Sequence, residues 1–205
     1  MKLYYFPGAC SLAAHIVLRE AGIPFELDKV DLATRKTETG ADFLAVNPKG
    51  YVPALELDDG QVLTEDQVIL QYVADLNTAS GLAPAWGSME RYRLMEWLAF
   101  IATEVHKTFG PLWNAEASEK TRQAAIALLS RRFDYLAGCL RGQEWLCGPG
   151  FTVADAYLCT VLGWAGYHKL DLTPWPILGE YIARVTARPS VQQAMQAEGL
   201  FSESQ

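Results

Sequence analysis

Cys10 is the first residue of the chain whose type and position could support covalent chemistry. It stands in MKLYYFPGACSLAAHIVLREAG, between a predicted strand at Leu3–Phe6 and a predicted helix at Ser11–Ala21. A cysteine at a helix N-terminus lies beside free backbone N–H groups and the positive end of the helix dipole, which favour a thiolate. A free cysteine in this position is equally compatible with a small buried hydrophobic residue. The local sequence leaves both interpretations open.

The other three cysteines, Cys139, Cys147 and Cys159, form no C-x-x-C pair and no cluster with metal-ligand spacing. This usage predicts a reduced compartment rather than a disulfide framework, and it predicts no bound metal. A dithiol oxidoreductase would carry its resolving cysteine three residues after Cys10, where this chain has Ala13. Thiol chemistry at Cys10 therefore requires an external thiol.

Composition excludes several classes of partner. The chain has 205 residues, of which 50% are hydrophobic and 20% charged, and its formal net charge is -7. Such a charge argues against binding to nucleic acid or to an anionic membrane surface. No hydrophobic run approaches the ~20 residues that a bilayer span needs, and Pro7 and Gly8 interrupt the N-terminal stretch that a signal peptide would require. We expect a cytoplasmic protein with no membrane segment.

Strands and helices alternate up to about residue 77. After the segments around Cys10, the sequence predicts a strand at Glu26–Val30 and a short helix at Asp42–Val46. A hairpin follows, formed by Ala54–Leu57 and Gln61–Leu63 around an Asp-Asp-Gly turn. Thr64 then has the capping-box spacing to Gln67 and predicts the start of the next helix. A β-α-β unit followed by a hairpin and a helix makes a small mixed sheet.

The second part of the chain has a different character. Residues 78–87 are rich in small and turn-forming residues and predict a linker. Four helices are predicted beyond it, over residues 88–113, 119–140, 151–167 and 175–189. The third opens with a Thr152-x-x-Asp155 capping box and is hydrophobic on all sides, which predicts a buried central helix. We therefore expect a first domain at 1–77, a linker at 78–87 and an all-helical domain at 88–205.

Four long segments of the chain resemble the beta class of bacterial cytosolic glutathione transferases. These segments are YYFPGACSLAAHIVLREAG, VNPKGYVPALELDDG, TEDQVILQYVAD and EWLAFIATEVHK. The resemblance covers essentially the whole chain. It implies an α+β/α fold, with a thioredoxin-like N-terminal domain of βαβαββα order and a C-terminal all-helical domain. It also implies glutathione as cosubstrate, no metal and a homodimer.

The resemblance assigns roles to several residues of the first domain. Cys10 would lie beside the glutathione sulfur. The Val52-Pro53 bond would be cis, so that the backbone of Val52 pairs with the cysteinyl backbone of glutathione as an added strand. Glu65 would hold the γ-glutamyl ammonium group.

Three further polar residues of this domain belong to the same expected site. The backbone N–H of Asp66 would meet the γ-glutamyl carboxylate, as helix N-termini bind anions. Similar beta enzymes carry a small residue at this position, so no role is implied for the Asp66 side chain. A basic residue of the pair Arg35-Lys36 would meet the glycyl carboxylate.

His106 is the main candidate of the second domain. It lies on a stripe of the predicted 88–113 helix that differs from the aliphatic one. The resemblance places it beside the glutathione sulfur as donor or base, next to Lys107. Thr103 of the partner subunit would reach the peptide. Beta enzymes usually have a polar side chain at position 99, where this chain has Ala99.

Aromatic residues of the helical domain could line a pocket for a hydrophobic cosubstrate. The candidates are Phe109, Trp113, Tyr157, Trp164 and Tyr167. The expected function is conjugation of the glutathione thiol to small hydrophobic electrophiles, with thiol transfer through a mixed disulfide at Cys10 as a second reaction. The alternative is a non-catalytic protein of the same fold that binds glutathione or hydrophobic ligands, since a fold alone does not prove activity.

Overall fold

The computed structural model describes residues 1–201 and divides them into two compact units. The first unit contains residues 1–83 together with residues 187–201, and the second contains residues 84–186. Sequence analysis assigns every residue from 88 onward to the helical domain, whereas the last segment packs with the first unit. The break between units, after Ala83, lies inside the expected linker.

The first unit is built on a five-stranded sheet in the order β3-β2-β1-β4-β5. The strands are β1 (Lys2–Tyr5), β2 (Glu26–Asp31), β3 (Lys36–Thr37), β4 (Ala54–Glu56) and β5 (Val62–Thr64). β1 runs parallel to β2 and antiparallel to β4, and the registers pair Leu3 with Leu27 and with Leu55. This mixed sheet confirms the thioredoxin-like prediction.

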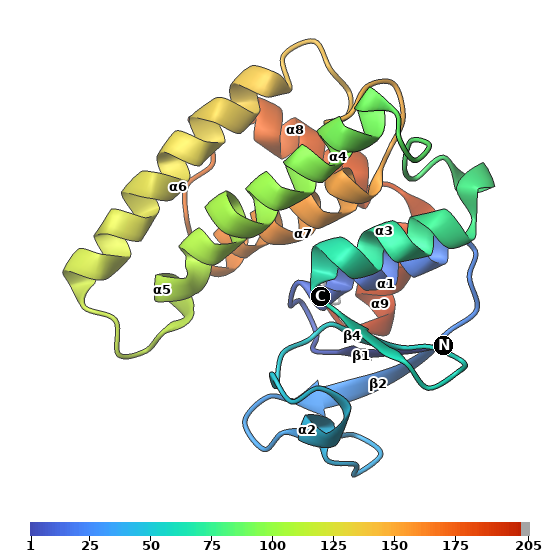
Figure 1. The fold of residues 1–205 in the computed structure, drawn as a ribbon. Helices are drawn as coiled ribbons and strands as arrows, with labels where there is room; N and C mark the ends of the chain where they lie inside the picture. Colours follow the sequence, from blue (N-terminus) through green and yellow to red (C-terminus); the bar gives the residue numbers. More distant parts are fainter. Residues whose placement is uncertain (202–205) are drawn as a thin grey trace. The chain divides into compact units, whose positions relative to one another are not determined.

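Helices cover both faces of this sheet (Figure 1). On one face lie α1 (Ser11–Glu20), α3 (Asp66–Leu76) and α9 (Pro189–Ala197), and α1 packs against the other two. The opposite face carries α2 (Phe43–Val46), whose fully buried Phe43 packs with Tyr4 and Val30 of the sheet. A short 3-10 turn, η1 (Thr78–Ser80), follows α3.

The second unit is helical. Its central helix is α7 (Val153–Tyr167), in which every residue from Val153 to Leu162 is buried, as the sequence predicted. The predicted capping box is present, because the backbone N–H and the hydroxyl of Thr152 both donate to Asp155 Oδ2. Around α7 lie α4 (Met89–Phe100), α6 (Glu119–Cys139) and α8 (Pro176–Thr186) (Figure 1).

Three predictions about helices are wrong. The expected helix at 88–113 is not continuous: α4 passes into a π-helical segment, η2 (Ile101–His106), then a 3-10 turn, η3 (Lys107–Phe109), and then α5 (Gly110–Trp113). Thr103 lies in the π segment and its hydroxyl donates to the Ala99 carbonyl, a backbone-directed bond that often accompanies irregular helix geometry. The wider π turn changes which side chains share a face.

The second wrong prediction concerns Thr64, which does not cap a helix. Thr64 pairs with Ala54 at the end of β5, and Glu65 then turns the chain into α3 with a φ of 68°. The third concerns Pro189: the predicted last helix, over residues 175–189, ends at Thr186, and Pro189 does not close the helical part of the chain. It instead begins α9 at the first helical position, where the missing N–H of proline costs nothing.

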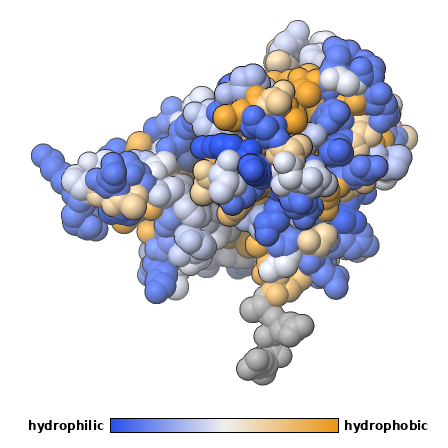
Figure 2. All heavy atoms as spheres, turned by 90° about the horizontal axis from the view of Figure 1, so that it is seen from below, coloured by the Kyte–Doolittle hydropathy of each residue, from blue (hydrophilic) through white to orange (hydrophobic). Residues whose placement is uncertain are grey.

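The face shown in Figure 2 carries mostly hydrophilic side chains, interrupted by one broader hydrophobic patch and some scattered hydrophobic atoms. No helix among residues 1–201 is long and hydrophobic enough to cross a membrane.

Candidate active site

Cys10 occupies the N-cap of α1, where the sequence placed it. Its side chain is half-buried, and the Sγ–H group donates to the carbonyl oxygen of Val52 over 3.4 Å. The preceding loop is fixed by Ser11, whose hydroxyl lies within hydrogen-bond distance of both the N–H and the carbonyl of Phe6. The helix dipole favours negative charge at this position. Cys10 is therefore a partly accessible thiol at an anion-stabilising helix end.

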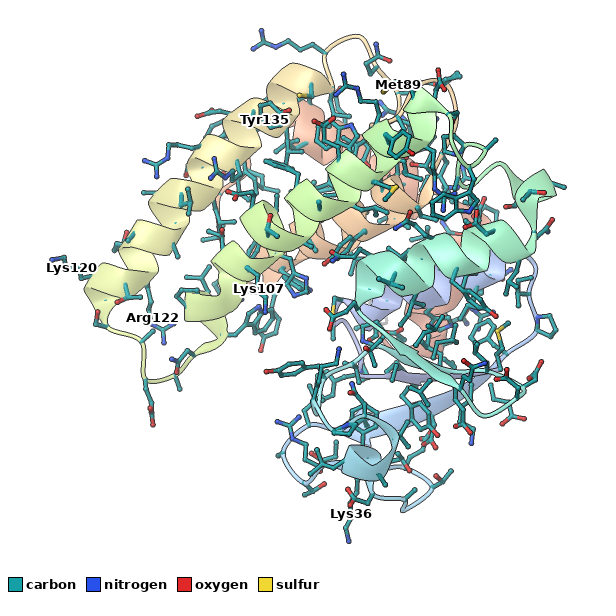
Figure 3. All side chains as sticks on the ribbon, viewed as in Figure 1. Lys36, Met89, Lys107, Lys120, Arg122 and Tyr135 are labelled. Carbon is teal, nitrogen blue, oxygen red and sulfur yellow. The ribbon has the colours of Figure 1, made fainter. Side chains whose placement is uncertain are left out.

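The loop that carries Val52 is held by polar contacts on its other side. The Val52-Pro53 bond is cis, as the resemblance implied. Upstream, the Asn47 side-chain amide donates to the Tyr51 carbonyl over 2.7 Å, and the Arg35 guanidinium donates to the Gly50 carbonyl over 2.5 Å. Arg35 therefore supports this loop in the structure. The neighbouring Lys36 has its side chain directed outward from β3 (Figure 3).

Glu65 forms an ion pair that sequence reasoning missed. Its Oε1 lies 2.5 Å from the Nζ of Lys49, which also donates to the Thr64 hydroxyl over 2.7 Å. The side chains of Lys49 and Glu65 are 47% and 57% exposed, so the pair is accessible to a ligand. The positive φ of Glu65 is uncommon for a residue with a side chain. Lys49 belongs to the Asn-Pro-Lys-Gly loop segment. Nothing in the local sequence of this loop predicts that the lysine pairs with Glu65 at the start of α3.

Asp66 is the first residue of α3, and its side chain is buried with both carboxylate oxygens unpaired among the described residues. Burial raises the pKa of this carboxyl well above its usual range, and the adjacent Glu65 charge raises it further. Burial therefore favours the protonated, neutral form of Asp66 over a second carboxylate beside Glu65.

His106 is the last residue of the π-helical segment, and it contacts two aromatic side chains of α7. Its Nδ1 lies 2.7 Å from the hydroxyl oxygen of Tyr157, and its ring meets Trp164 edge to face, with centroids 4.8 Å apart. Burial and, to a smaller extent, the charge of Lys107 together lower the pKa of His106 to about 4. The imidazole is therefore neutral at physiological pH, so it can donate or accept a hydrogen bond but carries no charge.

The other polar residues expected on this segment have different surroundings. Thr103 is exposed, and its hydroxyl donates to the Ala99 carbonyl one turn earlier. Glu104, one residue further, pairs with Arg132 of α6 and ties the π segment to that helix. Lys107 projects from the end of this segment (Figure 3).

The five aromatic candidates divide into two groups. Phe109, Tyr157 and Trp164 are 0%, 2% and 7% exposed, so they are core residues of the second unit. Trp113 and Tyr167 are 45% and 73% exposed, and their rings contact each other at a tilt of 32°, with centroids 4.9 Å apart. The described surface of this cluster is therefore formed by Trp113 and Tyr167, while the first three support it from behind. The ring of His168 also packs against Trp113, with centroids 4.2 Å apart.

A buried polar network supports the loop before Cys10. Both side chains of the His15–Glu198 pair are fully buried, with Nδ1 and Oε1 2.9 Å apart. Arg19 Nε donates to His15 Nε2, and the Gly8 N–H donates to Glu198 Oε2 over 2.9 Å. The segment after α9 thus binds the turn that leads to Cys10. Local sequence patterns could not predict this contact, because its two residues are 183 positions apart in the chain.

Comparison with known proteins agrees with this fold. Residues 8–76 match the glutathione S-transferase N-terminal domain and residues 100–189 match the C-terminal domain. The chain therefore belongs to the glutathione S-transferase family. It is 48% identical to glutathione S-transferase GstA of Escherichia coli O157:H7 over 200 residues, which cover 98% of this chain and all of that protein.

Solved structures give the same result. A glutathione transferase of Methylococcus capsulatus superposes with a TM-score of 0.96 at 67% identity, covering 98% of this chain and 99% of that one. The bacterial beta-class glutathione S-transferase of Sphingomonas chungbukensis also superposes with a TM-score of 0.96, at 49% identity, covering 98% of this chain and 100% of its own. These similarities extend over both units and place the chain with the bacterial beta class.

Proposed function

We propose that this protein is a glutathione transferase that joins the glutathione thiol to small hydrophobic electrophiles. The observation that carries the proposal is the position of Cys10, a half-buried thiol at the N-cap of α1 whose Sγ reaches the Val52 carbonyl before a cis proline. Family membership supplies the ligand, and this arrangement supplies a place for its sulfur.

The polar ends of glutathione have partners on the same unit. The ammonium group of the γ-glutamyl end binds Glu65, and its carboxylate accepts from the backbone N–H of Asp66 at the start of α3. The cysteinyl backbone pairs with Val52, and the glycyl carboxylate binds Arg35 or Lys36. Thr103 and Lys107 complete the set of residues assigned to the peptide. What supports this assignment is the exposure of Glu65 and the helix end beside it.

Conjugation proceeds by nucleophilic attack. The glutathione thiolate forms a carbon–sulfur bond to an electrophilic carbon, and a halide departs with the bonding electron pair, or an activated alkene takes up the pair and then a proton. Cys10 and the α1 dipole favour the thiolate, and neutral His106 offers a hydrogen bond to sulfur. The exposed Trp113 and Tyr167 provide the apolar contact surface for the electrophile.

Thiol transfer is a second reaction of the same cysteine. The Cys10 thiolate attacks a glutathione mixed disulfide, forms a disulfide with glutathione and releases the other thiol. A second glutathione thiolate then attacks this disulfide, which releases oxidised glutathione and restores Cys10. The external thiol is needed because position 13 is Ala13. Partial exposure of Cys10 supports this reaction.

We also infer that the protein works as a homodimer in the cytoplasm. Large apolar side chains stand exposed on α3 and α4, namely Val68, Leu76, Met89 and Tyr92. A two-fold partner that covers them would bring Thr103 of one subunit to the glutathione of the other. Light scattering tests the assembly: a monomer that binds glutathione normally would contradict this arrangement.

Retention on glutathione-agarose combined with two turnover assays tests the function. We expect retention of the wild-type chain, release by free glutathione, and turnover of both an activated aryl chloride and a glutathione mixed disulfide. Cys10→Ala should lose the disulfide reaction and keep much of the conjugation, because only the former needs a covalent bond to Cys10. Retention without turnover of either substrate would instead support the non-catalytic binder.

A further inference from the structure

The partner of His106 on α7 has no role in the site as assigned so far. Tyr157 is 2% exposed, so it cannot present a surface to a cosubstrate, and its hydroxyl oxygen lies 2.7 Å from His106 Nδ1. The two rings meet at 84° with centroids 5.9 Å apart, and Trp164 also packs edge to face with the imidazole. The imidazole is therefore held in one orientation by three contacts from one buried helix.

The direction of the hydrogen bond follows from the chemistry of its two groups. A phenol is a much stronger hydrogen-bond donor than a neutral imidazole N–H, and an imidazole nitrogen is a much stronger acceptor than a phenolic oxygen. The separation of 2.7 Å also matches a hydroxyl donor better than an N–H donor, which prefers about 2.9–3.0 Å. Since His106 is neutral at physiological pH, one ring nitrogen is free to accept. The Tyr157 O–H thus donates to Nδ1.

We infer that Tyr157 is a positioning residue that holds His106 in the tautomer with its proton on Nε2, so that His106 acts as a hydrogen-bond donor and not as a base. A neutral imidazole carries one proton, and when Nδ1 accepts from Tyr157 that proton must lie on Nε2. The catalytic consequence rests on the proposed function, because it concerns the bound thiolate. The tautomer itself does not, because it is a property of the free protein.

Nuclear magnetic resonance of protein labelled with ¹⁵N-histidine tests the tautomer in the absence of glutathione. Long-range ¹H–¹⁵N spectra distinguish a protonated from an unprotonated ring nitrogen, and His106→Gln assigns the signals. We expect Nε2 protonated and Nδ1 unprotonated in the wild type at pH 7, and a mixture of both tautomers in Tyr157→Phe. A wild-type spectrum with the proton on Nδ1 would overturn the inference, even if Tyr157→Phe does not fold.

Tyr181→Phe is the matched control. Tyr181 is another fully buried tyrosine of the second unit, and its hydroxyl donates to Asp155 Oδ1 over 2.8 Å. Both variants lose one buried hydroxyl and its hydrogen bond, so both should lower thermal stability. Only Tyr157→Phe should change the His106 signals. A change of equal size in Tyr181→Phe would show that the signals report general loosening of the unit, and it would contradict the inference.

Kinetics extend the test to the reaction. We expect Tyr157→Phe to lower kcat for conjugation by about tenfold, the equivalent of one hydrogen bond of about 1.4 kcal/mol, with little change in KM for glutathione. In a His106→Ala background the same substitution should have almost no further effect, since the residue acts through His106. An equal loss in both backgrounds would assign Tyr157 a merely structural role. If the wild type shows no conjugation, the proposed function fails while the tautomer result stands.

Discussion

The Sγ atom of Cys10 lies 3.4 Å from the carbonyl oxygen of Val52, the residue before cis Pro53. A protonated thiol can donate to this oxygen, whereas a thiolate is repelled by it. The same oxygen is the acceptor that the proposed site offers to the cysteinyl N–H of glutathione. Ionisation of Cys10 therefore removes its hydrogen bond to the Val52 carbonyl. The oxygen is then available to accept from the cysteinyl N–H of glutathione.

Cysteine alkylation provides the first prediction. Burial raises the pKa of Cys147 and of Cys159 to about 12, so almost no thiolate forms there at neutral pH. We expect iodoacetamide at pH 7 to label Cys10 first, the half-exposed Cys139 more slowly and these two least. Mass mapping measures the order, and labelling in denaturant provides the reference. Equal rates at all four sites in the folded protein would contradict the assignment of Cys10.

The ion pair of Lys49 and Glu65 provides the second. The Lys49 ammonium group donates to Oε1 of Glu65, the carboxylate that is proposed to bind the γ-glutamyl ammonium group. Lys49→Gln should therefore tighten glutathione binding by about two- to fivefold, since exposed ion pairs contribute up to about 1 kcal/mol. Calorimetric titration measures this, with the exposed Lys120→Gln as control. Weaker binding by Lys49→Gln would mean that the lysine contacts the ligand itself.

The third prediction concerns Asp66 at the start of α3, whose carboxylate oxygens have no hydrogen-bond partner among the described residues. The pKa of Asp66 is raised on folding, so between about pH 4 and the folded pKa the native state binds more protons than the unfolded state. Stability should then fall as pH rises through this window. Asp66→Asn should raise the free energy of unfolding at pH 7 by about 1–2 kcal/mol, and the gain should vanish near pH 4. Urea unfolding at both pH values measures this difference, and Glu116→Gln at an exposed site is the control. An equal gain in the free energy of unfolding at pH 4 would show that ionisation of Asp66 is not the cause.

The fourth concerns Glu198, which accepts from the Gly8 N–H and pairs with His15. Removing one member of a buried network typically costs about 3–5 kcal/mol. Glu198→Ala should therefore lower the free energy of unfolding by about this amount and accelerate alkylation of Cys10, because the turn before it loses its anchor. Glu198→Gln keeps an acceptor oxygen and should cost less. Equal effects of the two variants would show that the hydrogen bond to Gly8 contributes little.

Local sequence patterns predict most of the fold correctly and fail at identifiable residues. The helix after Cys10, the Asp155 capping box and the hairpin at β4 and β5 depend on local signals, and all are confirmed. The start of α3 is set by sheet pairing of Thr64, a tertiary contact that a capping-box pattern does not contain. Pro189 shows a second limit, because proline is compatible with the end of one helix and with the start of the next.

In the candidate site, too, some residues could be predicted from the sequence and others could not. Cys10 could be placed from its own neighbours in the sequence, and the resemblance indicated His106 and Glu65. The partners of these residues could not be predicted, because Tyr157 and Lys49 reach them across 51 and 16 positions of the chain. Tyr157 was predicted as a pocket residue because hydrophobic spacing does not reveal where a hydroxyl finds its acceptor.

The rate of glutathione-dependent chloride release from an activated aryl chloride tests the central claim most directly. We expect saturation with glutathione in the wild type and a KM for glutathione raised at least about tenfold in Glu65→Ala, the expected loss for a hydrogen bond to a charged group. The exposed Glu116→Ala should behave as the wild type. Chloride release no faster than in buffer, or a glutathione KM that Glu65→Ala leaves unchanged, would contradict the account.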